Sequence, residues 1–426
     1  MKKFYSVFSI AVLCLLVVSL FSLTIYAQSA NSWPMFHGDL AHTGYSTGSG
    51  PTTNQTLWTF NTNGEIWTSP VVVNGVVYVA SIGALGKIHP FGSSNVFAIN
   101  ATTGTRIWEH TLNKESFSSP AVANGLVYIG SDDYSFYALN ATTGAEVWKC
   151  TTGNYVQSSP TVSGGIVYFG SSDNHFYALD AISGMPIWNF TTGGNVISSP
   201  AVSNGVVYFG SYDHKIYALD ASTGGEKWNF TTGSVVESSP VVADGNVYVG
   251  SFDNQTYALN ANTGVLVWKL ATGYDQCIQA SPAFANGVIY TGGAFDYNVY
   301  ALDTMTGAIK WNHTTNAGIE MAPAIAGNTV YVTTALGNAT YALNAQTGAL
   351  IWVFQTRGNT YSSPAVVNGI AYFGSYDGNV YAIGQSASST NTSANSGILS
   401  VAYYLIILVV LIVIIAVAVL MLRRKR

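Results

Sequence analysis

Eleven residues, Ala218–Trp228 (ALDASTGGEKW), carry an acid, a Ser/Thr pair, two adjacent glycines, a second acid and a tryptophan. Such a set offers the carboxylate, hydroxyl and backbone groups of a cofactor site, and it also contains the residues of a tight turn. Near copies recur at Ala138–Trp148 and Ala301–Trp311. The motif therefore has two interpretations. A repeated cofactor site would favour an enzyme, and a repeated structural fastener between strands would favour a scaffold protein.

Other groupings that could support catalysis are weak. No His lies at the spacing of a catalytic triad or a zinc site, and His175 and His214 fall in turns of neighbouring repeats. The serines of the Ser-Ser-Pro elements recur, so we expect them to be part of inner strands. Five aspartates recur in Gly-Ser-x-Asp turns, where hairpin chemistry explains them. They are Asp133, Asp173, Asp213, Asp253 and Asp377.

The interior of the chain repeats with a period near 40 residues. One such unit predicts four strands, SSPAV, GVVYFGS, KIYAL and GEKWNF, with Asn-Gly and Thr-Gly turns between them. Four antiparallel strands repeated eight times are typical of a β-propeller, so we predict an all-β fold. The proline of the Ser-Ser-Pro element marks the eight units at Pro70, Pro120, Pro160, Pro200, Pro240, Pro282, Pro323 and Pro364.

Closure of the ring can also be predicted. The eighth unit ends at Val380–Gly384 (VYAIG) without a fourth strand, and a match to that strand, Thr56–Gly64 (TLWTFNTNG), precedes the first unit. We therefore expect the N-terminal segment to supply the outer strand of the last blade. A ring closed in this way has no unpaired strand edge.

The form Ala-[Leu/Ile]-[Asn/Asp]-x-x-[Thr/Ser]-Gly-x-x-x-Trp resembles the tryptophan-docking motif of the PQQ-like (pyrroloquinoline-quinone-like) repeat family, over nearly all of residues 56–385. The segment Trp33–Ser46 (WPMFHGDLAHTGYS) also resembles the lead-in of such propellers. The resemblance implies that each tryptophan lies between blades and packs on the backbone near a Thr-Gly turn, where glycine permits a positive φ. We therefore interpret the motif as a fastener, with docking residues Trp58, Trp108, Trp148, Trp188, Trp228, Trp268, Trp311 and Trp352.

The same family includes quinoprotein dehydrogenases, which hold one PQQ and one calcium ion at the propeller axis, with an aspartate base and commonly a disulfide between adjacent cysteines. This sequence has no adjacent cysteine pair, and Cys150 and Cys277 lie in different blades. Arg106 and Arg357, which lie near outer strands, are the only arginines outside the C-terminal cluster. No acidic cluster suggests the many oxygen ligands of calcium. The sequence predicts no catalytic residue, no metal site and no cofactor.

Binding residues of a propeller should differ among its blades. The position three residues before each marker proline lies at the mouth of the innermost strand. Read round the ring, this position gives an aromatic arc of Tyr361, Trp67 and Phe117 opposite a polar and acidic arc of Glu237, Gln279 and Glu320. The arcs predict a funnel suited to a glycan, a peptide loop or a cationic ligand, unless these side chains only plug a wide channel. The position is Ile197 in one blade, and the predicted ligand-binding residues in the others are Trp67, Phe117, Gln157, Glu237, Gln279, Glu320 and Tyr361.

Blade one carries an insertion of about ten residues within Ser81–Asn95. We expect it on the funnel face, as a lid, a partner contact or a tolerated insertion. Sequons at Asn54, Asn254 and Asn338 would allow surface glycosylation in an organism that glycosylates.

The two ends of the chain predict export and anchoring. Two lysines precede an apolar run, Ile10–Leu23, and small residues follow it, which indicates a secretory signal peptide or an uncleaved anchor. Ile398–Leu422 carries no charge and is followed by Arg-Arg-Lys-Arg, so we expect one transmembrane helix with a cytoplasmic C-terminus. All 20 acids and only 9 of the 15 basic residues lie between these ends, a net charge of 9 − 20 = −11. That charge argues against nucleic acid or anionic lipid headgroups as partners of this part.

The sequence thus predicts a signal peptide (1–30), a lead-in (31–55), a propeller (56–385), a Ser/Thr/Asn-rich linker (386–397), a transmembrane helix (398–422) and a basic tail (423–426). We expect a non-catalytic cell-surface propeller, anchored in the membrane, that binds a protein or another ligand. The resemblance extends to the propeller lipoprotein of outer-membrane β-barrel assembly, which binds partner proteins without a cofactor. The alternatives are a PQQ-dependent oxidoreductase with a degenerate site and a glycan-binding surface protein.

Overall fold

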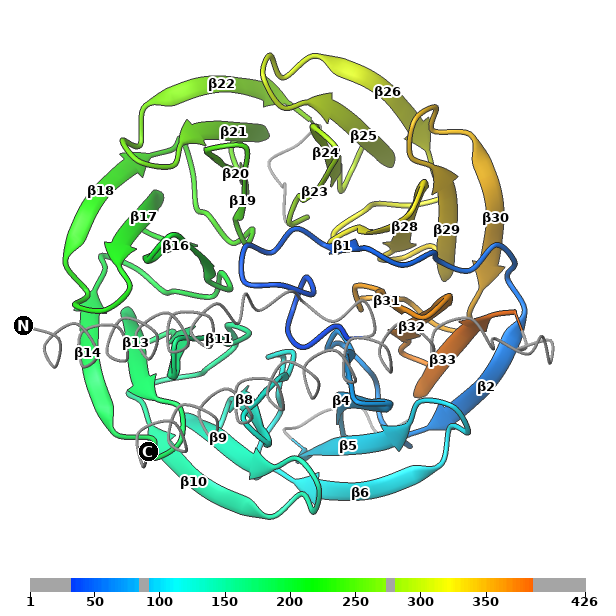
Figure 1. Ribbon diagram of the computed structural model, residues 1–426, viewed down its shortest axis with the longest axis horizontal. Helices are drawn as coiled ribbons and strands as arrows, with labels where there is room; N and C mark the ends of the chain where they lie inside the picture. The colour runs from blue at the N-terminus through cyan, green and yellow to red at the C-terminus, as the bar shows by residue number, and fades with distance from the viewer. Residues whose placement is uncertain (1–31, 84–91, 273–279, 386–426) are drawn as a thin grey trace, which may run out of the picture. The chain divides into compact units, whose positions relative to one another are not determined.

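The β-branched and aromatic runs of each repeat form antiparallel strands, and in the computed structural model they build eight sheets arranged in a ring (Figure 1). The structure describes residues 32–83, 92–272 and 280–385. Seven of these sheets have four strands, and blade seven has a fifth, β1 (Tyr45–Ser46), which pairs in parallel with its innermost strand. The predicted eight-bladed propeller is confirmed.

Each blade begins at the axis with a short strand and continues outward through three longer ones. The innermost strands are β3 (Val71–Val73), β7 (Ala121–Ala123), β11 (Thr161–Ser163), β15 (Ala201–Ser203), β19 (Val241–Ala243), β23 (Ala283–Ala285), β27 (Ala324–Ala326) and β31 (Ala365–Val367). The second strands are β4 (Val76–Ile82), β8 (Leu126–Ser131), β12 (Ile166–Gly170), β16 (Val206–Gly210), β20 (Asn246–Ser251), β24 (Val288–Gly292), β28 (Thr329–Thr334) and β32 (Ile370–Gly374).

The outer half of each blade contains the motif that links it to its neighbour. The third strands are β5 (Ser94–Asn100), β9 (Ser135–Asn140), β13 (His175–Asp180), β17 (Lys215–Asp220), β21 (Gln255–Asn260), β25 (Asn298–Asp303), β29 (Ala339–Asn344) and β33 (Asn379–Gly384). The outer strands are β6 (Arg106–Thr111), β10 (Glu146–Thr151), β14 (Pro186–Thr191), β18 (Glu226–Thr231), β22 (Leu266–Ala271), β26 (Ile309–Thr314), β30 (Leu350–Gln355) and β2 (Thr56–Asn61).

The innermost strands are shorter than the Ser-Ser-Pro-Ala-Val runs suggested. Each begins directly after the marker proline, so the serines precede the strand. Their side chains join the blades instead: the amide of Ser119 donates to Oγ of Ser159 at 2.9 Å, and equivalent bonds of 2.9–3.1 Å occur at seven of the eight blade junctions in the described residues. The eighth junction lacks the bond because Ala322 has no hydroxyl. These serines are buried structural residues.

The tryptophan motif joins neighbouring blades farther from the axis. In blade four, Ala218 pairs with Trp228 and Leu219 with Glu226, so the outer strand carries one extra residue, and the same shift accompanies every docking tryptophan. Nε1 of each ring donates to a backbone carbonyl beyond its own blade at 2.9–3.3 Å. The pairs are Trp58 with Ala101, Trp108 with Ala141, Trp148 with Ala181, Trp188 with Ala221, Trp228 with Ala261, Trp268 with Thr304, Trp311 with Ala345 and Trp352 with Pro51.

The rest of the motif shapes the turn on which the tryptophan rests. Oδ1 of Asp220 accepts hydrogen bonds from the amides of Ser222 and Thr223, both at 3.1 Å. Gly224 has a φ of +72°, and a Cβ atom there would lie 2.7 Å from the ring of Trp188. Glycine is therefore required for both the backbone conformation and the close approach of the ring. The motif is a structural fastener.

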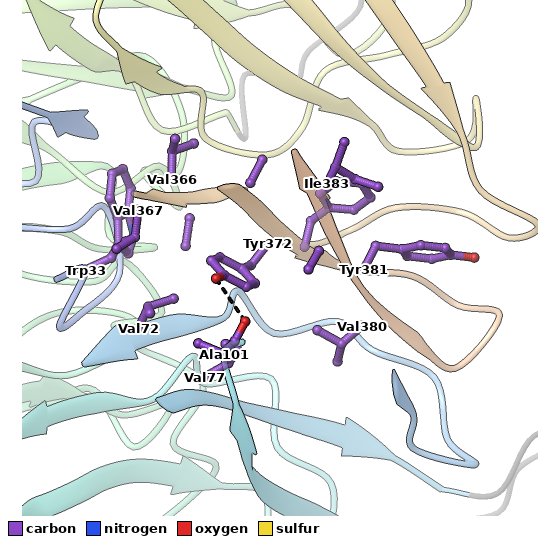
Figure 2. Close-up of a cluster of buried hydrophobic side chains, with 14 of the residues drawn as sticks. Trp33, Val72, Val77, Ala101, Val366, Val367, Tyr372, Val380, Tyr381 and Ile383 are labelled. Atoms are coloured by element: carbon purple, nitrogen blue, oxygen red, sulfur yellow. Dashed lines mark hydrogen bonds between the residues drawn. The ribbon is translucent and has the colours of Figure 1, made fainter. Parts of the chain in front are cut away.

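The ring closes where the sequence predicts. β2 pairs with β33 in blade eight, with Trp58 opposite Ala382, and thereby joins the two ends of the propeller. Figure 2 shows the adjoining seam, where Tyr372 of blade eight donates through its hydroxyl to the carbonyl of Ala101 in blade one at 3.3 Å. Trp33 packs in the same cluster.

Several predicted features lie outside the described residues: the signal peptide (1–30), the linker (386–397), the transmembrane helix (398–422), the basic tail (423–426), Cys277 and Gln279. The central part of the blade-one insertion, 84–91, also lies outside them. Within the ranges that the structure describes, there is no helix of the length and apolarity needed to cross a membrane.

Candidate ligand-binding site at the propeller axis

The residues that vary among blades converge at the axis. All seven described residues at the position three before the marker proline line one cavity of about 450 Å³, and all seven are half-buried. They are Trp67, Phe117, Gln157, Ile197, Glu237, Glu320 and Tyr361. The structure thus brings together every predicted funnel residue except Gln279, which is not described.

Aromatic rings form one wall of this axial cavity. The ring centroid of Trp67 lies 5.1 Å from that of Tyr361 in a stacked arrangement, and 5.3 Å from that of Phe117 in an edge arrangement. A fourth ring, Tyr376, packs against Trp67 at 4.6 Å and Tyr361 at 4.9 Å. Nε1 of Trp67 donates to Glu65 at 3.3 Å. Since each ring contacts at least one other, the wall is held in shape before any ligand binds.

Two glutamates face the same cavity from blades five and seven. Glu237 accepts a hydrogen bond from the Tyr212 hydroxyl at 2.9 Å. Glu320 makes no side-chain hydrogen bond or ion pair within the described part of the chain. Burial raises the pKa of Glu320, and the nearby negative charge of Glu237 raises it further. Among the described residues that line the cavity there is no Lys, Arg or His, so the charged groups that they bring to it are acidic.

The amide of Gln157 extends this polar wall. Its Nε2 donates to the two carboxylate oxygens of Asp132 at 3.2 and 3.1 Å. Burial raises the pKa of Asp132 to about 6; the bond from Gln157 opposes the shift, and the charges of Glu115 and Asp133 add to it. Asp132 occupies the variable position of a Gly-Ser-x-Asp turn, and Tyr212 and Tyr376 occupy the same position in other blades.

The lead-in crosses the middle of the ring (Figure 1). Its Phe36 joins the lining of the cavity. The lead-in bonds to the innermost strands of seven blades. Backbone bonds of 2.6–2.9 Å join it to Val72, Val122, Val202, Val242, Phe284 and Ile325, and His42 approaches Thr161. In each of these blades, the residue that the lead-in contacts lies four or five positions after the mouth residue, towards the other end of the innermost strand. Phe36 of the lead-in therefore lines the end of the cavity opposite the mouth.

Two histidines are buried in the lead-in. Nδ1 of His37 donates to the carbonyl of His42 at 2.8 Å, and Nε2 of His42 lies 3.1 Å from the hydroxyl of Thr161. The other ring nitrogen of each histidine is buried without a hydrogen-bond partner. Burial lowers the pKa of His37 to about 4 and that of His42 well below its usual value. Both imidazoles are therefore neutral at neutral pH.

Sequence reasoning missed Phe36 and Tyr376. Phe36 lies in a non-repeating segment, and only its contacts with distant blades place it at the axis. Tyr376 could have been found, because it lies at the variable position of a recurring Gly-Ser-x-Asp turn, and that position follows the second strand in every blade that has the turn.

Comparison with known proteins decides the family. A family model described as "Outer membrane protein assembly factor BamB" matches residues 92–196, 183–280 and 275–395, which together cover more than half of the chain. The chain belongs to this PQQ-like propeller family. No curated protein matches it.

Solved structures share the fold of this PQQ-like propeller at low sequence identity. Quinohemoprotein alcohol dehydrogenase from Comamonas testosteroni superposes with a TM-score of 0.71 at 18% identity, covering 86% of this chain and 83% of that one. BamB from Moraxella catarrhalis gives 0.65 at 19% identity, covering 78% and 99%. A europium-containing methanol dehydrogenase gives 0.68 at 15%, covering 82% and 91%. These similarities establish the fold alone.

The axial residues of this propeller do not fit PQQ. The quinone carries three carboxylates, so a site for it needs cationic side chains, whereas the described lining carries two glutamates and no basic residue or cysteine. Across the described ranges, no group of three or more His, Cys, Asp or Glu side chains is arranged to hold a metal ion. The chemistry of this lining therefore gives no support to the quinoprotein alternative.

Proposed function

We propose that this PQQ-like propeller is a non-catalytic binding module, anchored in a membrane with the propeller outside the cytoplasm, and that it engages its ligand or partner at the axial cavity. One observation carries the proposal: the repeated residues fasten the blades, whereas the side chains that differ among blades meet in that cavity. The match to a family model described as an outer membrane protein assembly factor supports the same conclusion.

Site-specific photocrosslinking tests this binding role. The photoreactive residue p-benzoylphenylalanine replaces Ile197, which lines the cavity without belonging to either wall. After irradiation of the full-length protein in its native membrane, we expect a crosslinked partner or ligand. The crosslink should be lost in Trp67→Ala/Tyr361→Ala, which removes the stacked pair.

The matched control is Phe295→Ala/Leu336→Ala, because both side chains are large and exposed and neither lines the cavity. This control should leave the crosslink unchanged. A crosslink that survives loss of Trp67 and Tyr361, or none at all, would contradict binding at the axis.

The membrane arrangement has a separate test. The uncharged run 398–422 and the basic residues after it support an anchor with a cytoplasmic C-terminus. In intact cells, a membrane-impermeant amine reagent should label the propeller lysines, while an antibody against a C-terminal tag should bind only after permeabilisation. Labelling of the propeller only after permeabilisation would contradict the proposal.

A further inference from the structure

A second cavity, of about 720 Å³, adjoins the axial one. The two cavities share the side chain of Phe117, and Asp132, which lines the second, is hydrogen-bonded to Gln157, which lines the first. Tyr134 and Tyr155 face the second cavity, and their ring centroids are 5.4 Å apart. One ligand that covers Phe117 can therefore contact both cavities.

Both cavities combine aromatic rings with carboxylates. The described lining of the axial cavity includes Glu237 and Glu320 and no basic residue. The described lining of the second cavity carries three carboxylates and one basic residue; they are Glu115, Asp132, Asp133 and Lys114. Ring faces attract cations, and nearby carboxylates strengthen that attraction where water is partly excluded. A cationic group on the ligand would offset the negative charge of the two partly buried glutamates, which a neutral ligand cannot do.

The shape of the site favours a chain that lies across it. Because Phe36 and the lead-in close the inner end of the axial cavity, a polypeptide cannot thread through the ring, but a long side chain can enter from the mouth. The second cavity then lies beside the backbone of the same segment.

We propose that the two cavities bind an extended basic segment of a partner protein. One Arg or Lys head group enters the axial cavity between the aromatic wall and the two glutamates. A second basic side chain from the same segment occupies the cavity next to Phe117. This inference rests on the proposed function, because it names the partner chemistry of the axial site.

Fluorescence anisotropy with the full-length protein in detergent tests the inference. The probes are fluorescein-labelled Gly-Ser peptides that carry two arginines, two glutamines, two glutamates or one arginine. The two-arginine peptide should bind most tightly, and its affinity should fall as salt is raised. Equal binding of the two-glutamine peptide would overturn the cationic specificity.

Charge-removing variants localise the effect. Glu237→Gln/Glu320→Gln should weaken binding of the two-arginine peptide by about tenfold or more. The control Glu146→Gln/Glu226→Gln removes the same net charge from exposed outer strands and should change binding less than about twofold. Equal losses in the two double variants would overturn the site assignment. If the first double variant does not fold, Glu320→Gln alone carries the test, since this side chain makes no bond in the described structure.

The second cavity has its own readout. Tyr155→Ala, which changes a ring of the second cavity alone, should weaken the two-arginine peptide about fivefold and leave the one-arginine peptide unchanged. Equal effects on both peptides would overturn the two-cavity arrangement. If the two-glutamine peptide binds as tightly as the two-arginine peptide, and Trp67→Ala/Tyr361→Ala abolishes that binding, the axial cavity remains a binding site. The inference that its partner is basic would then be overturned. An absence of both peptide binding and the crosslink at Ile197 would overturn both proposals.

Discussion

Trp228 and Trp67 are the same residue type in different surroundings. Trp228 is 8% exposed, packs against Gly264 and donates to the Ala261 carbonyl. Trp67 is half-buried at the axis among other rings. The first side chain fills the wedge between two blades, whereas the second forms the wall of a cavity. Residue type alone does not distinguish the two roles, but repetition does, because a fastener is needed at every blade junction.

Substitution of these two residues should separate the roles. Trp228→Ala should lower the free energy of unfolding by about 3–5 kcal/mol, since it leaves a void between blades and an unpaired carbonyl. Trp67→Ala should cost about 1–2 kcal/mol, because its ring is already partly hydrated. Urea unfolding of the full-length protein in detergent measures both. Similar losses in the two variants would mean that Trp67 also serves mainly as a structural residue.

Prediction from the sequence succeeded for elements that repeat. The eight marker prolines predicted the blades and the mouth positions, because one register applied to every unit. The match of Thr56–Gly64 to the missing fourth strand predicted the closing strand. The lead-in could not be placed in the same way. Its backbone bonds to strands as distant in sequence as β23 and β27, and those contacts depend on a ring that forms only when the whole domain folds. The floor of the cavity, Phe36, was missed for that reason.

The lead-in should make the stability of the propeller depend on pH. Burial lowers the pKa of His37 to about 4, below its ordinary 6.5, so the unfolded chain binds this proton more readily. The free energy of unfolding should therefore rise with pH between these values. His37 contributes about 3 kcal/mol, present in full above pH 6.5 and lost as the pH falls towards 4. Urea unfolding across this range measures the slope.

His37→Asn provides the control for this pH dependence. Asparagine tolerates the positive φ of 57° at this position and keeps a hydrogen-bond donor for the His42 carbonyl. The slope should decrease without vanishing, since the pKa of His42 is also lowered. Burial raises the pKa of Asp39, so this carboxyl makes the free energy of unfolding fall as the pH rises. Asp39 is present in both proteins, so its contribution cancels when the two slopes are compared. An unchanged slope would exclude His37 as its source.

At the scale of the ring, the charge of the axial cavity predicts the response to the family's cofactor. PQQ and calcium added together should not raise the melting temperature of the full-length protein, because two glutamates would repel the carboxylates of the quinone. Differential scanning fluorimetry and a dye-linked alcohol oxidation assay check this expectation. A saturable rise in the melting temperature together with dye reduction would restore the quinoprotein alternative.

Closure of the ring has a mechanical consequence that one matched pair of variants can measure. Replacing the strand Thr56–Asn61 by Gly-Ser repeats removes the pairing with β33 and the bond from Trp58 to blade one. The same replacement at Glu226–Thr231 removes an equivalent outer strand, yet blade four stays tied to the chain on both sides. Both changes expose the edge of a third strand, β33 or β17, but only the first opens the seam between the two ends of the propeller, so it should cost about 2 kcal/mol more. Thermal unfolding distinguishes the variants, and equal behaviour would show that the lead-in closes the ring without its strand.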